Sequence, residues 1–114
     1  MFAAICADGT AGHYYMAANA SSSDFVVFLE GGGGCAHDQK LSEETRGRSP
    51  QLFTSEGFPE NIEAYGFLSG DSVENPLYST YNRVYLPYCT MDMYLLDTAT
   101  SGGELQFRGR PLLE

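Results

Sequence analysis

Residues Asp24 to Cys35 have the sequence DFVVFLEGGGGC, in which five consecutive apolar residues are followed by one acidic residue, four glycines and a cysteine. The apolar run, Phe25 to Leu29, is too short for an ordinary helix and is made of aromatic, β-branched and aliphatic residues, so it predicts a buried core strand. Glycine adopts positive φ angles and lets other atoms approach the backbone closely. Gly31 to Gly34 can therefore direct several N–H groups at one point, which is typical of an anion or oxyanion site.

The segments on either side of this stretch indicate an α/β fold with a partial mixed sheet and few helices. Before it, Phe2 to Cys6 and His13 to Ala18 are short strand-like segments separated by a glycine-containing turn, and we expect them to form a hairpin at a sheet edge. After it, His37 to Arg46 contains good helix formers, and Gly47 is a plausible stop for that helix.

The remaining segments supply one more strand and little further helix. Ser49 to Pro76 is interrupted by prolines and glycines, which predicts an irregular path with at most a helical turn or two. Arg83 to Cys89 predicts a second buried strand, with pairing that ends near Pro87 because proline cannot donate to a sheet ladder. Since one helix cannot cover both faces of such a sheet, we expect residues 1–114 to form a single, incomplete domain.

Composition excludes several classes of partner. The chain has 114 residues, a net charge of -9 and only six Lys and Arg residues, so neither nucleic acid nor an anionic membrane is an expected partner. No apolar run in it approaches the roughly 18 residues of a membrane span. Met1 to Cys6 lacks the basic start and the length of a signal peptide.

The glycine-rich stretch and four further segments resemble one enzyme family. LEGGGGC (Leu29 to Cys35) is similar to the LEGGGWC or LEGGWYC stretch of the pectin acetylesterases and Notum carboxylesterases, which are serine hydrolases with an α/β-hydrolase fold. Matching segments follow the family's order: CADGTAGHYY (Cys6 to Tyr15), GFLSGDSVENP (Gly66 to Pro76), YNRVYLPYC (Tyr81 to Cys89) and LQFRG (Leu105 to Gly109). The resemblance covers nearly the whole chain and implies the N-terminal part of an α/β-hydrolase domain.

The same resemblance assigns a role to each glycine of the loop. Gly32 and Gly33 are implied as the oxyanion-hole donors, and Glu30, Gly31 and Gly34 as the supporting loop. The family has an aromatic residue where this chain has Gly33 or Gly34. Because that side chain would wall the acyl pocket, the resemblance does not extend to a preference for one acyl group.

The catalytic triad of a serine hydrolase has no counterpart in this sequence. The usual nucleophile motif is G-x-S-x-G, but Ser69-Gly70 and Ser101-Gly102 both lack the leading glycine. The base should follow the nucleophile in an α/β hydrolase, whereas His13 and His37 both lie near the start of the chain. The 114 residues alone are therefore expected to be inactive, although the resemblance implies that their parent is an esterase.

Cysteine usage and a short motif favour a secreted parent. The three cysteines are an odd number, so at least one lacks an internal partner. Cys6 and Cys89 match family cysteines and are implied as a disulfide pair, while the family's partner for Cys35 has no counterpart here. Asn19-Ala20-Ser21 is a possible glycosylation acceptor. An intracellular chain with three free thiols is the alternative.

The resemblance implies an acylated polysaccharide or an acylated protein as substrate, without a cofactor. Pectin acetylesterases deacetylate cell-wall pectin, and Notum removes a fatty acyl group from a signalling protein. A second class of function stays open, in which the chain is a non-catalytic or pseudoenzyme product that binds at most weakly.

Four other patterns resemble functional sites but have simpler explanations. Cys35, His37 and Asp38 lie close in sequence, but no second pair has zinc-like spacing, so no metal site is expected. The glycine run also lacks the lysine and hydroxyl residue of a phosphate-binding loop. Asp92 and Asp97 are interpreted as solvated loop carboxylates. The tyrosines between residues 78 and 94 suggest a carbohydrate platform but are better explained as packed sheet residues.

Overall fold

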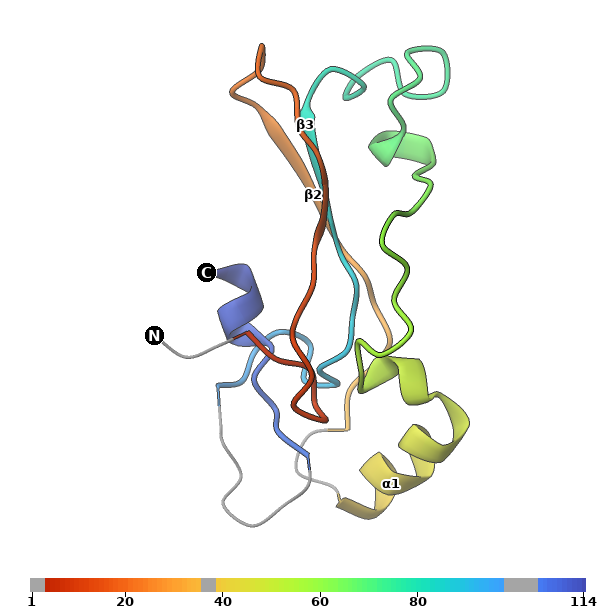
Figure 1. Ribbon diagram of the computed structural model, residues 1–114, viewed down its shortest axis with the longest axis vertical. Helices are drawn as coiled ribbons and strands as arrows, with labels where there is room; N and C mark the ends of the chain where they lie inside the picture. Colours follow the sequence, from red (N-terminus) through yellow and green to blue (C-terminus); the bar gives the residue numbers. More distant parts are fainter. Residues whose placement is uncertain (1–3, 36–38, 98–104) are drawn as a thin grey trace. The chain divides into compact units, whose positions relative to one another are not determined.

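The computed structural model describes residues 4–35, 39–97 and 105–114 (Figure 1). These residues form two compact units, each assembled from separate stretches of the chain. One unit comprises Met1–Gly12, Gly31–Phe58 and Tyr88–Glu114, and the other comprises His13–Glu30 and Pro59–Pro87. The sheet lies in the second unit, and the four glycines lie in the first.

The sheet has three strands in the order β1-β3-β2. Strand β2 (Phe25–Leu29) runs parallel to β3 (Asn82–Leu86), and β1 (Tyr15–Ala17) pairs with β3 in the antiparallel sense. Figure 1 shows β2 and β3 side by side over their whole length. The predicted mixed sheet is therefore present, and β3 ends at Leu86, immediately before the proline that was expected to limit it.

The hairpin predicted between Phe2 to Cys6 and His13 to Ala18 was wrong. Residues 15–17 pair with β3, some 70 positions later, and the segment before them contributes only an isolated antiparallel bridge between Ile5 and Ala11. Local turn signals favoured a hairpin, but the tertiary pairing with β3 prevails because it places Tyr15 opposite Tyr85 on one face of the sheet.

Strand β2 is the edge of the described sheet and not a buried core strand. Phe25, Val27 and Leu29 are 57, 54 and 41% exposed, whereas Val26 and Phe28 on the other face are partly covered. On the covered face the aromatic ring of Phe28 stacks on that of Tyr85, with 5.5 Å between the ring centroids. The centroid of the Phe67 ring lies 5.7 Å from that of Phe28. The hydrophobic run is thus a strand, as predicted, with only one face packed against described residues.

The helix continues two residues beyond its predicted end at Arg46. Helix α1 spans Gln39–Arg48, and the expected start at His37 falls outside the described residues. Gly47 does not end it; the helix continues to Arg48 and stops before Ser49, which adopts a φ of -140°. The following residue is Pro50, and a residue that precedes proline avoids helical geometry, so the proline is the stop signal.

The long segment predicted to be irregular contains two short 3-10 turns, η1 (Pro50–Leu52) and η2 (Gly66–Leu68). Arg83 on β3 fixes η2, because its guanidinium donates to the Leu68 carbonyl at 3.2 Å. A Cβ on Gly70 would lie 2.8 Å from the same guanidinium, so a larger residue at position 70 would require the Arg83 side chain to shift.

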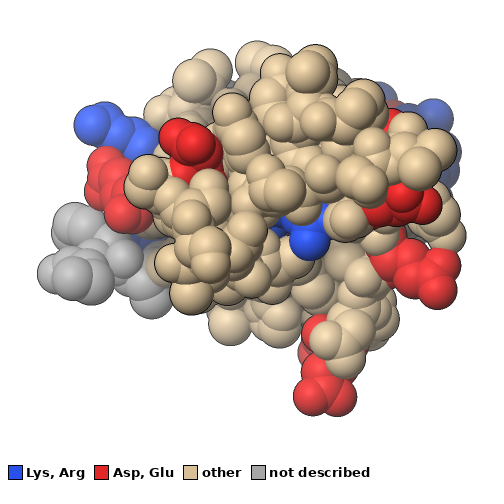
Figure 2. Space-filling model, turned by 90° about the horizontal axis from the view of Figure 1, so that it is seen from above, with Lys and Arg blue, Asp and Glu red and all other residues tan. Residues whose placement is uncertain are grey.

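One face of the molecule carries few charged side chains. Figure 2 shows one face on which tan surface predominates and acidic side chains stand mostly around its margin. The acidic side chains on this face therefore lie in several separate places and not in one cluster. Among the described residues, no helix has the length and apolar character that crossing a bilayer requires.

Candidate functional site

The glycine loop begins where strand β2 ends. Glu30 follows β2 and donates its backbone N–H to the Leu86 carbonyl at 3.0 Å, which extends the β2–β3 pairing by one step. Burial, and then a hydrogen bond from the Tyr85 hydroxyl to the Glu30 carboxylate, raise the pKa of Tyr85. Glu30 therefore anchors the end of the strand by both its backbone and its side chain.

Gly33 and Gly34 are held by a second segment of their own unit. Gly34 forms an isolated antiparallel bridge with Asp92, and the Cys35 N–H donates to the Met91 carbonyl at 3.0 Å. Gly33 has a φ of +79°, a left-handed conformation that favours glycine. The loop therefore has a defined backbone path, and glycine at residue 33 has a conformational reason.

The Tyr88 hydroxyl ties the two segments together. It donates to the Gly33 carbonyl at 2.6 Å and accepts from the Met93 N–H at 2.7 Å. Tyr88 is only 2% exposed, and burial raises the pKa of its hydroxyl, which keeps the group protonated as a donor. One buried side chain thus fixes the direction of the Gly33 carbonyl.

Gly32 packs directly on the ring of Tyr88. A Cβ at residue 32 would lie 2.6 Å from Tyr88 Cδ1 and 2.8 Å from Leu52 Cδ2, distances that no real Cβ tolerates. Residue 32 must therefore be glycine for the loop to lie against the ring.

The N–H groups of Gly32 and Gly33 remain open. Both residues are exposed, and within the described parts of the chain neither N–H donates to an acceptor. Because the neighbouring Gly33 carbonyl is locked by Tyr88, these donors lie in a fixed frame and stay available to an external oxygen.

Asp92 lies inside the unit, so its interpretation as a solvated carboxylate was wrong. The residue is 3% exposed, and its side chain accepts three backbone N–H bonds: Oδ1 from Tyr94 at 3.0 Å, and Oδ2 from Leu96 at 3.3 Å and Gly109 at 2.7 Å. Gly109 is required here because a Cβ at that position would collide with this carboxylate and lie 2.6 Å from Thr90 Oγ1. Asp97, by contrast, is exposed and pairs with Arg108 at 2.9 Å.

The segment that carries Asp92 has an unusual backbone. Met91, Met93 and Tyr94 have φ angles of 52, 54 and 59°, although none of them is glycine. Left-handed conformations cost about 1 to 3 kcal/mol at ordinary residues and are kept where surrounding contacts enforce them. The carboxylate of Asp92 and the hydroxyl of Tyr88 provide those contacts.

The cysteines occupy the interior of the same unit. Cys6 and Cys89, the pair implied by the resemblance, are joined by a disulfide, with 4.9 Å between their Cα atoms. Cys35 is a buried free thiol, and the Ser42 hydroxyl donates to its carbonyl at 3.0 Å. No group of three metal-ligating side chains occurs among the described residues, and His37 and Asp38 lie outside them.

Two other predicted positions lie in the sheet-containing unit. His13 is exposed and precedes β1. The Asn19 amide donates to the Thr80 carbonyl at 2.6 Å, and its oxygen accepts from the Ser21 N–H at 3.0 Å. Glycosylation at Asn19 stays a prediction.

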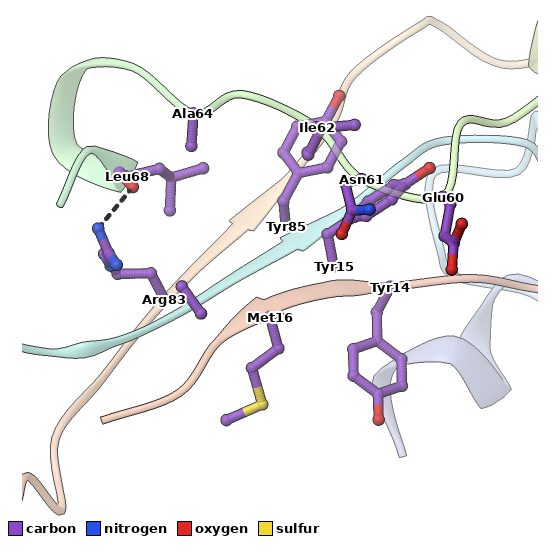
Figure 3. A pocket seen from close by; sticks show the side chains of 11 residues that line it. Tyr14, Tyr15, Met16, Glu60, Asn61, Ile62, Ala64, Leu68, Arg83 and Tyr85 are labelled. Carbon is purple, nitrogen blue, oxygen red and sulfur yellow. Dashed lines mark hydrogen bonds between the residues drawn. The ribbon is translucent and has the colours of Figure 1, made fainter. Parts of the chain in front are cut away.

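The sheet-containing unit also has an open groove of about 240 Å³. Figure 3 shows Asn61 and Ile62 over the sheet face that carries Tyr15 and Tyr85, while Met16 and Tyr14 point away from them. The Tyr15 hydroxyl donates to the Pro59 carbonyl at 2.6 Å. Tyr15 and Tyr85 therefore serve mainly to pack the segment after residue 59 against the sheet. For Tyr85, this agrees with its interpretation as a packed sheet residue.

Comparisons with known proteins agree with the resemblance. The family model described as Pectinacetylesterase matches residues 2–114. Palmitoleoyl-protein carboxylesterase notum2 of Xenopus laevis is 30% identical over 113 residues, and Pectin acetylesterase 4 of Arabidopsis thaliana is 33% identical over 88 residues. The alignments cover 96 and 75% of this chain, but only 22 and 21% of those two proteins.

A solved structure shows the same backbone. The Wnt deacylase Notum from Drosophila superimposes with a TM-score of 0.85 at 34% identity, covering 96% of this chain and 30% of the Notum chain. The small mixed sheet with its single helix therefore corresponds to part of an α/β-hydrolase fold, as predicted. On the family match over residues 2–114 and this structural likeness, the chain belongs to the pectinacetylesterase family.

Proposed function

We propose that this chain supplies the oxyanion-hole loop of a carboxylic-ester hydrolase, with Gly32 and Gly33 as the donors. The observation that carries the proposal is the pair of open N–H groups on a loop whose path is fixed by Tyr88 and by the bridge to Asp92. Membership of an esterase family supports the reaction class.

The chemistry requires such donors. When a nucleophile attacks an ester carbonyl, negative charge develops on the carbonyl oxygen, and donors already in place stabilise it without reorganising. One donor lowers the barrier by about 3 kcal/mol, or about a hundredfold or more in rate. The Tyr88 bond to the Gly33 carbonyl supports this role because it prevents the loop from turning its N–H groups away.

The nucleophile and the base are proposed to come from other parts of the hydrolase. The sequence contains no G-x-S-x-G motif, and this chain covers only 22% of the Xenopus protein and 30% of the solved Drosophila Notum chain. In this proposal residues 1–114 form one incomplete domain and have no esterase activity of their own. If the chain never forms part of a complete enzyme, the second candidate function is that of a non-catalytic binding protein.

The substrate is proposed to be an acylated polysaccharide or an acylated protein outside the cell. The names of the relatives support these two classes, since one is a pectin acetylesterase and another a palmitoleoyl-protein carboxylesterase. A disulfide between Cys6 and Cys89 supports an oxidising compartment, because such bonds are rare in the cytosol.

An acetate titration tests the proposed donors directly. The acetate carboxylate stands in for the oxyanion, and the amide resonances of the oxidised, ¹⁵N-labelled chain report on each glycine separately. We expect saturable shifts at Gly32 and Gly33 that chloride at equal ionic strength does not produce. Gly9 and Gly57 are internal controls, because, like Gly33, they have positive φ angles and open surroundings. Equal responses at all four glycines would contradict the assignment.

A further inference from the structure

The side chain of Met93 lies beside the glycine loop with most of its surface open. It is 61% exposed, and its Cγ would be 3.5 Å from a Cβ at Gly34. The Met91 carbonyl oxygen would lie 3.4 Å from the same Cβ, so Met93 Cγ is the side-chain atom that borders the loop at this point. An exposed methionine provides flexible apolar surface that adapts to a hydrophobic ligand.

The position of Met93 is tied to that of the proposed donors. Its N–H donates to the Tyr88 hydroxyl at 2.7 Å, and the same hydroxyl donates to the Gly33 carbonyl at 2.6 Å. The left-handed φ of 54° at Met93 is maintained within this arrangement. A movement of Met93 would therefore disturb the loop, and the two features form one constructed site.

A second exposed apolar side chain follows Met93 in the sequence. Leu95, two residues further on, is 66% exposed, whereas the carboxylate of Asp92 between the two methionines is buried on three N–H groups. The ligand that suits this arrangement has one oxygen that accepts from N–H groups and an apolar chain attached next to it. An acyl group longer than acetyl has this chemistry.

We propose that Met93 determines the acyl-chain preference of the site by forming the apolar wall along which the chain lies. The proposal rests on the function proposed above, because it takes Gly32 and Gly33 as the groups that bind the acyl oxygen. It adds a specificity-determining residue that the glycine motif does not contain.

The test compares acetate with octanoate, below its micelle concentration, on the ¹⁵N-labelled chain with ¹³C-labelled methionine methyl groups. We expect octanoate to bind at least fivefold more tightly than acetate and to shift the Met93 methyl together with the Gly32 and Gly33 amides. Met93→Asn introduces a polar side chain, and asparagine tolerates the positive φ of this position. Met93→Gly removes the side chain altogether. Either variant should bring the octanoate affinity close to that of acetate.

Met16→Thr is the matched control, because Met16 is 46% exposed on β1 and should leave the fivefold preference intact. A preference that persists in both Met93 variants would overturn the role of Met93 while acetate still shifts Gly32 and Gly33. If neither acid shifts those amides, the proposed function itself fails and the inference fails with it. The amide spectrum of each variant shows whether it is folded.

Discussion

The Asp92→Asn variant is expected to lose about 3 kcal/mol of unfolding free energy, a large share of the stability of a small protein. The Asp92 carboxylate accepts from the backbone N–H groups of Tyr94, Leu96 and Gly109 in a buried position. An amide would replace one accepting oxygen with a donor and turn it toward an N–H group. Urea unfolding followed by circular dichroism measures the difference.

Asp97→Asn is the matched control for this substitution. Asp97 is an exposed carboxylate in the same segment, paired with Arg108 at 2.9 Å, and exposed pairs contribute about 0 to 1 kcal/mol. Equal losses in the two variants would show that Asp92 does not organise the loop. A selective loss at Asp92 should also broaden the Gly33 and Gly34 amide resonances, because Gly34 bridges to Asp92.

Removing the disulfide by the double substitution Cys6→Ser and Cys89→Ser is expected to cost about 4 kcal/mol. The bond joins residues 83 positions apart, and restraint of so long a loop in the unfolded chain accounts for a loss of this size. Thermal unfolding of the variant, and of the native chain with and without reductant, measures the effect.

Cys35→Ala is the control, since Cys35 is buried but free and its loss should cost less than the loss of the bridge. Peptide mapping without reductant should recover Cys6 joined to Cys89. A map that joins Cys35 to either cysteine, or a thermal transition that reductant leaves unmoved, would refute the pairing.

Much of the sheet could be predicted because its strands carry local signals. The run Phe25 to Leu29 and the segment before Pro87 are hydrophobic and bounded by turn or proline residues, and both are strands. The pairing of β1 could not be predicted in the same way, because it depends on a partner about 70 residues away. Turn residues near His13 suggested a local hairpin and outweighed that long-range contact in the prediction.

The glycine loop was visible in the sequence, but the residues that shape it were not. Tyr88 was interpreted as a packed sheet residue, and nothing in its neighbours indicates that its hydroxyl reaches Gly33, 55 positions earlier. In the sequence Asp92 looks like any loop carboxylate, because nothing near it indicates that it accepts a hydrogen bond from Gly109. The positive φ angles of Met91, Met93 and Tyr94 have no local signal either, because these residue types disfavour that conformation.

The most direct test of the proposed oxyanion loop is to replace the matching stretch of Drosophila Notum with residues 1–114 and measure hydrolysis of p-nitrophenyl octanoate. The backbones superimpose with a TM-score of 0.85, which makes the exchange feasible. The account predicts that the chimera hydrolyses the ester while the 114-residue chain alone stays at the background rate. Gly33→Pro in the chimera should lower kcat by about a hundredfold or more, because proline lacks the N–H donor and cannot adopt the φ of +79° at residue 33. Gly47→Ala, at a position of α1 with open space and outside the glycine loop, should leave kcat unchanged. A folded, monomeric chimera without turnover, or one indifferent to Gly33→Pro, would contradict the account.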